Sequence, residues 1–288
     1  MITQTPTPTH QAVKKYYGNV AREAGACCKT SSEASTCCGP SAVPDKIQND
    51  LYPPELLAAL PAEVANFTAG SGDPISLAGL LPGEIVLDLG SGAGLDCFLA
   101  AKQVGENGLV IGVDMTPEML KRAKSNKARL KAQNVEFREG YLEALPVDDN
   151  NLDVIISNCV INLSPDKPQV FREMVRVLKP GGRIAVSDMV ANHPHSEEAQ
   201  KDEGDWCGCT AGALTDKAYT QELSKAGFVN IRLEPNVEAI LKAVESGRAR
   251  TKSGDKPSKE QVLESLRNWE KVEETMTVPY KITASKPA

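Results

Sequence analysis

Between residues 77 and 190, apolar segments of strand length alternate with segments of helix length, and this alternation limits the chain to a small set of folds. Strands are expected at residues 84–89, 109–113, 135–138, 152–160 and 183–189, and helices at residues 95–104, 117–131 and 167–178. Strands that alternate with helices form a parallel sheet covered by helices on both faces. We therefore predict a doubly wound α/β fold with a mostly parallel sheet, in which the fourth strand lies beside the first.

The segments on either side of this region are less regular. Thr and Pro alternate over residues 1–10, which predicts a disordered tip that includes His10, and residues 11–26 and 51–64 are expected to form short helices. Later strands are expected at residues 228–233 and 278–285, with helices near residues 216–226, 236–246 and 258–271. We divide the chain into an N-terminal arm (1–73), a core (74–190) and a C-terminal α+β region (191–288) that completes the sheet.

The composition excludes several classes of protein. The chain has 32 Lys and Arg residues against 38 Asp and Glu residues, and the resulting net charge of −6 repels phosphate backbones. We therefore expect no nucleic-acid partner. No run of apolar residues approaches the ~20 that a membrane helix needs, and the chain does not start like a secretion signal. We expect a cytoplasmic monomer with no membrane partner, whose eight cysteines are free thiols.

A glycine-rich loop follows the first expected strand. Gly90, Gly92 and Gly94 stand in DLGSGAG, where a backbone without Cβ atoms can turn tightly and approach a ligand. An ordinary tight turn is the alternative interpretation. Asp114, at the end of the second strand, stands where an acidic residue accepts hydrogen bonds from ribose hydroxyls in this topology. The loop and the acid together predict a site for a nucleoside.

Two features of the loop favour S-adenosylmethionine over NAD. Leu95 occupies the position where the dinucleotide fingerprint requires a third small residue. Asp88, two residues before the first glycine, suits a ligand that carries a cation, and S-adenosylmethionine has an ammonium and a sulfonium but no phosphate. The chain resembles the class I S-adenosylmethionine-dependent methyltransferases, which have a Rossmann-like fold, in the segments DLGSGAG, IGVDMTPEML and VLKPGG. The residues expected to bind this cofactor are Asp88, Gly90, Gly92, Gly94, Asp114, Met115 and Asn158.

Two cysteines stand where the topology predicts a ligand cleft. Cys159 ends the fourth strand, and Cys209 lies in WCGCTAGAL, a segment expected to fold over the cleft. For Cys159 alone, a small buried hydrophobic side chain is the alternative interpretation, and Cys97 is expected in the core. A structural metal is not predicted, because the C-x-C spacing of Cys207 and Cys209 does not supply the four ligands that zinc requires.

The chain resembles the arsenite methyltransferases in four places: SNCVINLSPDKPQVFREMVRVLKPGG, WCGCTAGAL, KKYYGNV and the adjacent Cys27 and Cys28. The resemblance implies that Cys159 and Cys209 bind As(III) and that a methyl group passes to it from S-adenosylmethionine. It also implies that Cys27 and Cys28 help to capture arsenic. The substrate would be arsenite or its thiol conjugate, and turnover would consume a thiol reductant of the glutathione or thioredoxin type.

The chain departs from this family at one position, because Ser71 stands where its members usually carry a further cysteine. A hydroxyl is a poor ligand for a soft centre. The third arsenic ligand is then an exogenous thiol, Cys207 or an N-terminal cysteine. Two other functions remain open: a carbon or oxygen methyltransferase that acts on a quinone-type ring, and a thiol-rich protein that binds a metalloid without turnover.

Overall fold

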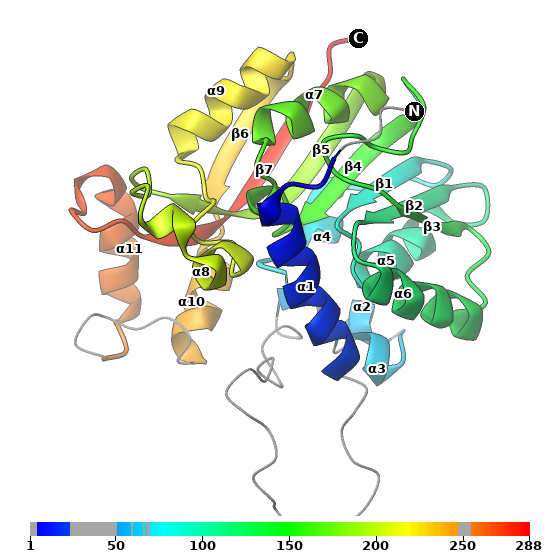
Figure 1. The fold of residues 1–288 in the computed structure, drawn as a ribbon, viewed down its shortest axis with the longest axis horizontal. Helices are drawn as coiled ribbons and strands as arrows, with labels where there is room; N and C mark the ends of the chain where they lie inside the picture. The colour runs from blue at the N-terminus through cyan, green and yellow to red at the C-terminus, as the bar shows by residue number, and fades with distance from the viewer. Residues whose placement is uncertain (1–4, 24–50, 59, 66, 68–69, 247–254) are drawn as a thin grey trace, which may run out of the picture.

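A computed structural model describes residues 5–23, 51–58, 60–65, 67, 70–246 and 255–288 (Figure 1). Its centre is a seven-stranded sheet with the strand order β3-β2-β1-β4-β5-β7-β6. The strands are β1 (Ile85–Leu89), β2 (Leu109–Asp114), β3 (Val135–Glu139), β4 (Leu152–Asn158), β5 (Leu178–Ala191), β6 (Val229–Pro235) and β7 (Thr277–Ser285). The predicted α/β fold is confirmed, including the late strands.

The sheet is parallel from β3 to β5, and β7 then inserts antiparallel between β5 and β6. β1 and β4 are neighbours, as the sequence predicts. After β1 the chain adds β2 and then β3 on one side of β1, and it then returns to add β4 and β5 on the other side. In such sheets ligands bind beyond the carboxyl ends of the strands at this reversal of strand order.

Helices cover both faces because successive side chains of a strand point to opposite sides. Val86 of β1 packs in one apolar cluster with residues of α5, whereas Leu87 packs in a second cluster with Phe171 of α7. The main helices of the first side are α4 (Pro74–Ala78), α5 (Leu95–Val104) and α6 (Pro117–Leu130). On the second side lie α7 (Lys167–Val177) and α9 (Asp216–Ala226), and α10 (Val237–Glu245) and α11 (Lys259–Arg267) pack near β7.

The structure corrects the prediction for the N-terminal arm. Helix α1 spans Pro8–Glu23, so the tip expected to be disordered contains the first turn of a helix, and His10 is buried. The single helix expected at residues 51–64 is instead two short ones, α2 (Pro54–Leu57) and α3 (Ala62–Ala65). Pro61 lacks the amide proton that a continuous helix would need at that position.

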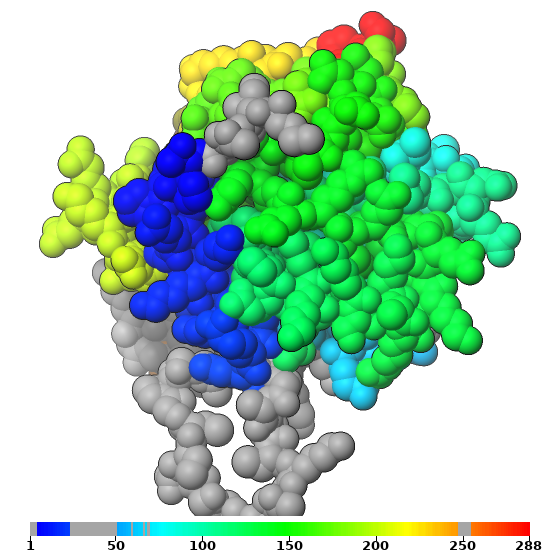
Figure 2. All heavy atoms as spheres, turned by 45° about the vertical axis from the view of Figure 1, so that its right-hand side comes forward, coloured from blue at the N-terminus to red at the C-terminus, as the bar shows by residue number. Residues whose placement is uncertain are grey.

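Helix α1 lies across the carboxyl end of the sheet (Figure 1). It contacts α6, the short helix α8 (Glu203–Cys207) and the 3₁₀ turn Ile161–Leu163. In the space-filling view α1 is the dark blue ridge between the yellow-green segment near residue 200 and the green body of the molecule (Figure 2). The N-terminal arm therefore covers the edge of the sheet where a ligand is expected. Within the described ranges, no helix is long and apolar enough to cross a bilayer.

Candidate functional site

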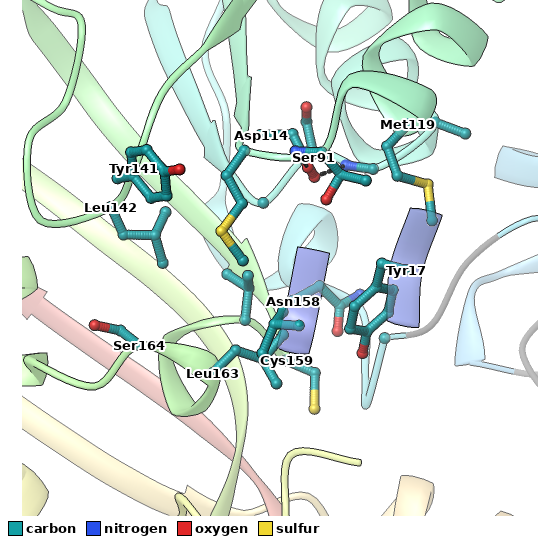
Figure 3. A pocket seen from close by; sticks show the side chains of 18 of the residues that line it. Tyr17, Ser91, Asp114, Met119, Tyr141, Leu142, Asn158, Cys159, Leu163 and Ser164 are labelled. Atoms are coloured by element: carbon teal, nitrogen blue, oxygen red, sulfur yellow. Dashed lines mark hydrogen bonds between the residues drawn. The ribbon is translucent and has the colours of Figure 1, made fainter. Parts of the chain in front are cut away.

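A cavity opens beneath α1, at the carboxyl ends of β1, β2 and β4 (Figure 3). It holds ≈ 1150 Å³ of empty space, open solvent at its mouth included. The glycine loop forms one wall, and the segments that follow β3 and β4 form the opposite wall. Its position beyond the carboxyl ends of the strands is the one at which sheets of this topology bind a ligand.

The glycine loop turns tightly at the cavity because its three glycines adopt positive φ angles, which favour glycine. Gly90 has a φ of 65°, and a Cβ atom there would lie 2.3 Å from the Val160 side chain. Gly90 and Gly92 both line the cavity. Between them Ser91 is 8% exposed, and its hydroxyl has no hydrogen-bond partner. A buried polar group without a partner is costly, so this hydroxyl is available to a ligand.

Asp114 lies across the loop and fixes its position. One carboxylate oxygen accepts a hydrogen bond from the Gly92 amide at 2.9 Å, and the other accepts one from the Thr116 amide at 2.7 Å. Burial raises the pKa of Asp114 above its usual value, while these two amide bonds oppose that shift. Asp114 and Met115 both line the cavity, at the position that the sequence assigned to the cofactor.

Two residues of the predicted cofactor set lie outside the cavity wall. Asp88 is 2% exposed beneath the loop, where it accepts a hydrogen bond from the Cys97 thiol at 3.1 Å. Burial and the neighbouring carboxyl of Asp96 raise the pKa of Asp88 well above its usual value. Gly94 precedes α5 with a φ of 93°, and a Cβ atom there would lie 2.7 Å from the Phe137 ring. Both residues therefore contact buried side chains beneath the loop and do not face the cavity.

Asp96 is a cavity residue that the sequence reasoning missed. It lies in the first turn of α5 and accepts hydrogen bonds from the Tyr52 hydroxyl at 2.7 Å and from the Asn158 amide at 3.4 Å. Burial raises the pKa of Asp96 to about 7, although both hydrogen bonds oppose the shift. Its place two residues after the last glycine is the signal that could have identified it.

Asn158 joins the cavity to the turn that contains Ser71. Its side-chain oxygen accepts a hydrogen bond from the Ser71 amide at 2.8 Å, and its nitrogen donates to the Gly72 carbonyl at 2.8 Å. The Ser71 hydroxyl hydrogen bonds with the Ser187 hydroxyl at 3.1 Å. Asn158, which the sequence assigns to the cofactor, lines the cavity, whereas Ser71 does not line it.

Cys159 lines the cavity and Cys209 contacts it from behind the wall, although the two are separated by 50 residues in the sequence. The Cys209 thiol donates a hydrogen bond to the Cys159 carbonyl at 2.8 Å. The two residues are 8% and 2% exposed, and Cys159 lines the cavity (Figure 3). Their φ angles are 60° and 61°, a left-handed conformation that costs a non-glycine residue ~1 kcal/mol or more. The surrounding structure therefore holds both cysteines in place against local strain.

The surroundings of Cys209 favour its protonated thiol. Interaction with the Cys159 thiol and burial raise the pKa of Cys209 well above its usual value, and Asp188 adds to the shift. Cys207 is also buried, in the same apolar cluster as Cys159 and Cys209, and burial raises its pKa. Of the other predicted thiols, Cys27 and Cys28 lie outside the described residues.

Cys97 is fully buried beneath the loop, as predicted. The four described cysteines are all free thiols. Among the residues that the structure describes, no group of three or more His, Cys, Asp or Glu side chains is arranged to hold a metal ion. Among the described thiols, Cys159 at the cavity and the contacting Cys209 are the candidate pair of soft ligands.

A second polar cluster joins α1 to the opposite wall. His10 Nε2 lies 3.0 Å from a Glu143 carboxylate oxygen, and the same oxygen accepts a short hydrogen bond from the Ser164 hydroxyl. The His10 ring also meets the Tyr141 ring edge-on at 4.9 Å between centroids. All four residues line the cavity. The cluster holds the start of α1 onto the segments that follow β3 and β4.

Lys167 lies under the loop that carries Cys209. Its ammonium donates to the Ser164 carbonyl at 2.9 Å and lies 5.0 Å from the centre of the Trp206 ring. The residue is 7% exposed, and burial lowers the pKa of its ammonium to about 8, against the opposing effect of Asp188. A cationic side chain thus lies beneath the thiol pair without reaching the cavity wall.

Comparison with known proteins identifies the relatives of this chain. Residues 80–227 match the family model described as a methyltransferase domain. The chain is 42% identical to the arsenite methyltransferase of Halobacterium salinarum, over 81% of this chain and 61% of that protein. It is 39% identical to the arsenite methyltransferase of Aquipseudomonas alcaligenes, over 78% of this chain and 63% of that protein. The chain therefore spans less than two thirds of the length of these curated relatives.

A solved structure supports the same relationship. The crystal structure of an arsenic(III) S-adenosylmethionine methyltransferase from Chlamydomonas reinhardtii is 34% identical, with a TM-score of 0.61. The match covers 82% of this chain and 73% of that one. The sequence matches and the structural match therefore point to the same group, the methyltransferases that act on arsenic.

Proposed function

The chain belongs to the arsenite methyltransferase family, and we propose that it transfers methyl groups from S-adenosylmethionine to thiol-bound As(III). The observation that carries this proposal is the pair of buried, contacting cysteines Cys159 and Cys209, of which Cys159 lines the cavity that the glycine loop also lines. A methyltransferase acting on a quinone-type ring has no use for two thiols there. The proposal also includes a thiol reductant as partner and a small trivalent arsenical as substrate.

The chemistry of arsenic matches the residues present. As(III) is a soft centre that prefers thiolates, and two cysteines leave its lone pair free. That lone pair is the nucleophile, so the methyl acceptor needs no general base. S-adenosylmethionine supplies a methyl group on a positively charged sulfur, which leaves as a neutral thioether with the bonding electron pair. A thiol reductant then returns the oxidised arsenic to the trivalent state.

The residues of this chain contribute mainly positioning. The glycine loop and Asp114 form the wall at which the nucleoside would bind, and Cys159 on the same cavity, with Cys209 in contact behind it, would hold the metalloid. Holding the two reactants in line makes the transfer effectively intramolecular, which can supply ~7–11 kcal/mol of the barrier. The apolar surroundings of the pair, formed by Val13 and Leu163 among others, exclude water from the arsenic.

The test is a set of single substitutions that remove one sulfur each. We expect Cys159→Ser and Cys209→Ser to abolish arsenite methylation while S-adenosylmethionine still binds with unchanged affinity. Cys97→Ser removes a buried thiol from the opposite side of the loop and is expected to retain activity. The assay separates arsenic species by chromatography and measures S-adenosylhomocysteine in parallel.

Each alternative predicts a different result. If both serine variants keep full activity, the two sulfurs are not the arsenic site. If the wild-type chain takes up arsenite but forms no S-adenosylhomocysteine, the chain binds metalloids without turnover.

A further inference from the structure

One phenol from the segment before α2 reaches the cavity wall from behind. Tyr52 is 3% exposed, and its ring belongs to the apolar cluster that also contains most of α5. It stands outside residues 80–227, the part of the chain that matches the methyltransferase domain. Its hydroxyl nevertheless contacts Asp96 and Asn158, two side chains that line the cavity. Tyr52 is thus a residue of the N-terminal arm that supports the wall without lining the cavity itself.

The neighbours of Asn158 fix the direction of each hydrogen bond at the Tyr52 hydroxyl. The Ser71 and Gly72 amides lie 2.8 and 3.3 Å from the Asn158 side-chain oxygen, and a backbone amide can only donate. The Asn158 nitrogen therefore faces Tyr52, whose hydroxyl oxygen accepts a bond from it at 2.8 Å. The single proton of the Tyr52 hydroxyl is then donated to Asp96 at 2.7 Å. Tyr52 thus joins the side chains of Asn158 and Asp96 into one fixed arrangement.

Asp96 is a buried carboxylate that forms no ion pair with the described part of the chain. It is 7% exposed at the cavity wall, and none of the ion pairs among the described residues includes it. Buried charges in proteins are otherwise paired, because an unpaired charge loses its hydration without compensation. The other two carboxylates of the wall are held differently: Asp114 accepts bonds from two backbone amides, and Glu143 lies against His10. Asp96 is therefore the wall carboxylate that a cationic group of a ligand would complete.

The electrostatics of this group agree with its geometry. Burial raises the pKa of Asp96 to about 7, and the Tyr52 hydrogen bond makes the largest of the opposing contributions. Burial and Asp96 raise the pKa of Tyr52 well above its usual value, so its hydroxyl stays a donor. The other titratable groups close to Asp96 are Asp73, Asp88 and Cys97. The phenol thus favours the charged form of the carboxylate that it contacts.

We propose that Tyr52 is a positioning residue for the cofactor, whose hydroxyl holds the Asp96 carboxylate at the cavity wall as the binding site of a ligand ammonium group. S-adenosylmethionine carries such an ammonium at its amino-acid end. A carboxylate that is already held in place loses less freedom when the ligand binds than a mobile one does. The identity of the cofactor rests on the proposed function, whereas nothing in this inference depends on arsenic.

Three adenosyl ligands test the assignment by calorimetry on the full chain at pH 8, above the pKa of Asp96. S-adenosylhomocysteine has an ammonium and a carboxylate, its decarboxylated analogue keeps the ammonium, and methylthioadenosine has neither group. All three carry a neutral sulfur, so they differ at the amino-acid end. We expect Tyr52→Phe, which keeps the ring and removes the hydroxyl, to weaken binding of the two ammonium ligands about tenfold, as loss of a hydrogen bond to a charged group predicts. Methylthioadenosine should bind both proteins with affinities within about twofold of each other, because it has no ammonium for Asp96 to contact.

A control and a double-mutant cycle separate positioning from general support of the fold. The matched control is Tyr280→Phe, which removes the hydroxyl of another buried tyrosine, outside the cavity wall, and should leave all three affinities in place. In an Asp96→Asn background, Tyr52→Phe should change the affinity for the decarboxylated analogue by less than about twofold, because no charge is left to hold. In turnover, Tyr52→Phe should raise KM for S-adenosylmethionine about tenfold and leave kcat within about twofold, since the ammonium is remote from the methyl group.

Two results would overturn the inference. One is an equal effect of Tyr52→Phe on all three ligands, whether a common loss or no change, which would leave the phenol without a role at the ammonium. The other is a tenfold effect of Tyr52→Phe that persists in the Asp96→Asn background, because the phenol would then not act through this carboxylate. A wild-type chain that shows the expected selectivity among the ligands but does not methylate arsenite would leave the inference intact and refute the proposed function instead.

Discussion

Asp96 and Asp114 both line the cavity, but the protein holds them differently. Two backbone amides stabilise the charge of Asp114, whereas a phenol and a side-chain amide contact Asp96. Backbone amides of the loop are fixed donors, so Asp114 is matched to neutral hydroxyl groups such as those of ribose. Asp96, with a pKa of about 7, is the carboxyl whose charge a cationic ligand can change.

This difference predicts a pH dependence for cofactor binding. A ligand ammonium beside Asp96 favours the ionised carboxylate, so below pH 7 binding must first remove a proton from it. We expect the affinity for S-adenosylmethionine to rise up to tenfold per pH unit from pH 5.5 to about 7. Asp96→Asn should bind more weakly at pH 7 and lose this slope, and Glu106→Gln, an exposed control, should keep it. Calorimetry at each pH measures the affinities, and an equal slope in Asp96→Asn and wild type would contradict the prediction.

The raised pKa of the buried Asp188 carboxyl leads us to expect that folding stability depends on pH. Burial raises its pKa to about 7 from 3.8, so between these values the folded state holds a proton that the unfolded state has lost. Stability from this group is therefore fully present below about pH 4 and is lost as the pH rises to 7, by at most about 4 kcal/mol. We expect the difference in unfolding free energy between wild type and Asp188→Asn to change by a few kcal/mol from pH 5 to pH 7. Urea denaturation of both proteins measures it, and parallel pH profiles would show that Asp188 is already ionised at pH 5.

Among the elements, α1 shows where sequence reasoning fails and why. The alternation of Thr and Pro suggested disorder, but Pro8 stands at the first turn of the helix, where proline is favoured. What stabilises this turn is His10 against Glu143, a contact across 133 residues that no local pattern reveals. The Thr7 amide also donates to His10 Nδ1 at 3.1 Å, which orients the ring.

The contact between His10 and Glu143 predicts the behaviour of the arm. A buried hydrogen bond to a charged group contributes ~1.5–3 kcal/mol, so His10→Ala should open α1 at least tenfold more often. We expect faster hydrogen exchange over residues 8–23 and faster release of S-adenosylmethionine, both compared with Lys15→Ala on the exposed face of the same helix. If exchange in α1 is the same in both variants, the histidine does not hold the arm.

The sequence predicted the strands more completely than it predicted the residues of the cavity. β1, β2 and β4 are continuous apolar runs because they are buried on both faces, and such runs are visible in the sequence. The loop glycines, Asp114 and Cys159 follow these runs directly, so the sequence could place them at one edge of the sheet. Asp96 was missed because its helix is buried almost throughout. Tyr52 was missed because its partners Asp96 and Asn158 lie 44 and 106 residues away in the sequence.

At the scale of the whole molecule, the sheet continues through two of the three proposed segments, the core (74–190) and the C-terminal region (191–288). The proposed core ends at residue 190, near the end of β5. β5 nevertheless pairs with β7 of the C-terminal region along nine residues, from Arg183 opposite Ser285 to Ala191 opposite Thr277. Buried side chains of the C-terminal region, including Tyr219 and Ile282, belong to the same apolar cluster as Ile184 and Val186 of β5. The segments 74–190 and 191–288 are thus parts of one core.

This continuity predicts which fragments can fold. A fragment of residues 74–190 would expose the edge of β5 and the apolar side chains that the C-terminal region covers, and we expect it to aggregate or to lack fixed tertiary packing. A fragment of residues 51–288 keeps all seven strands and loses only the first 50 residues, which include α1, so it should unfold cooperatively in urea. It should also react faster with a thiol reagent at Cys159 than the whole chain does, because α1 no longer covers the cavity. Near-ultraviolet circular dichroism and denaturation compare the two, and a cooperative transition in the 74–190 fragment would establish the core as an independent domain.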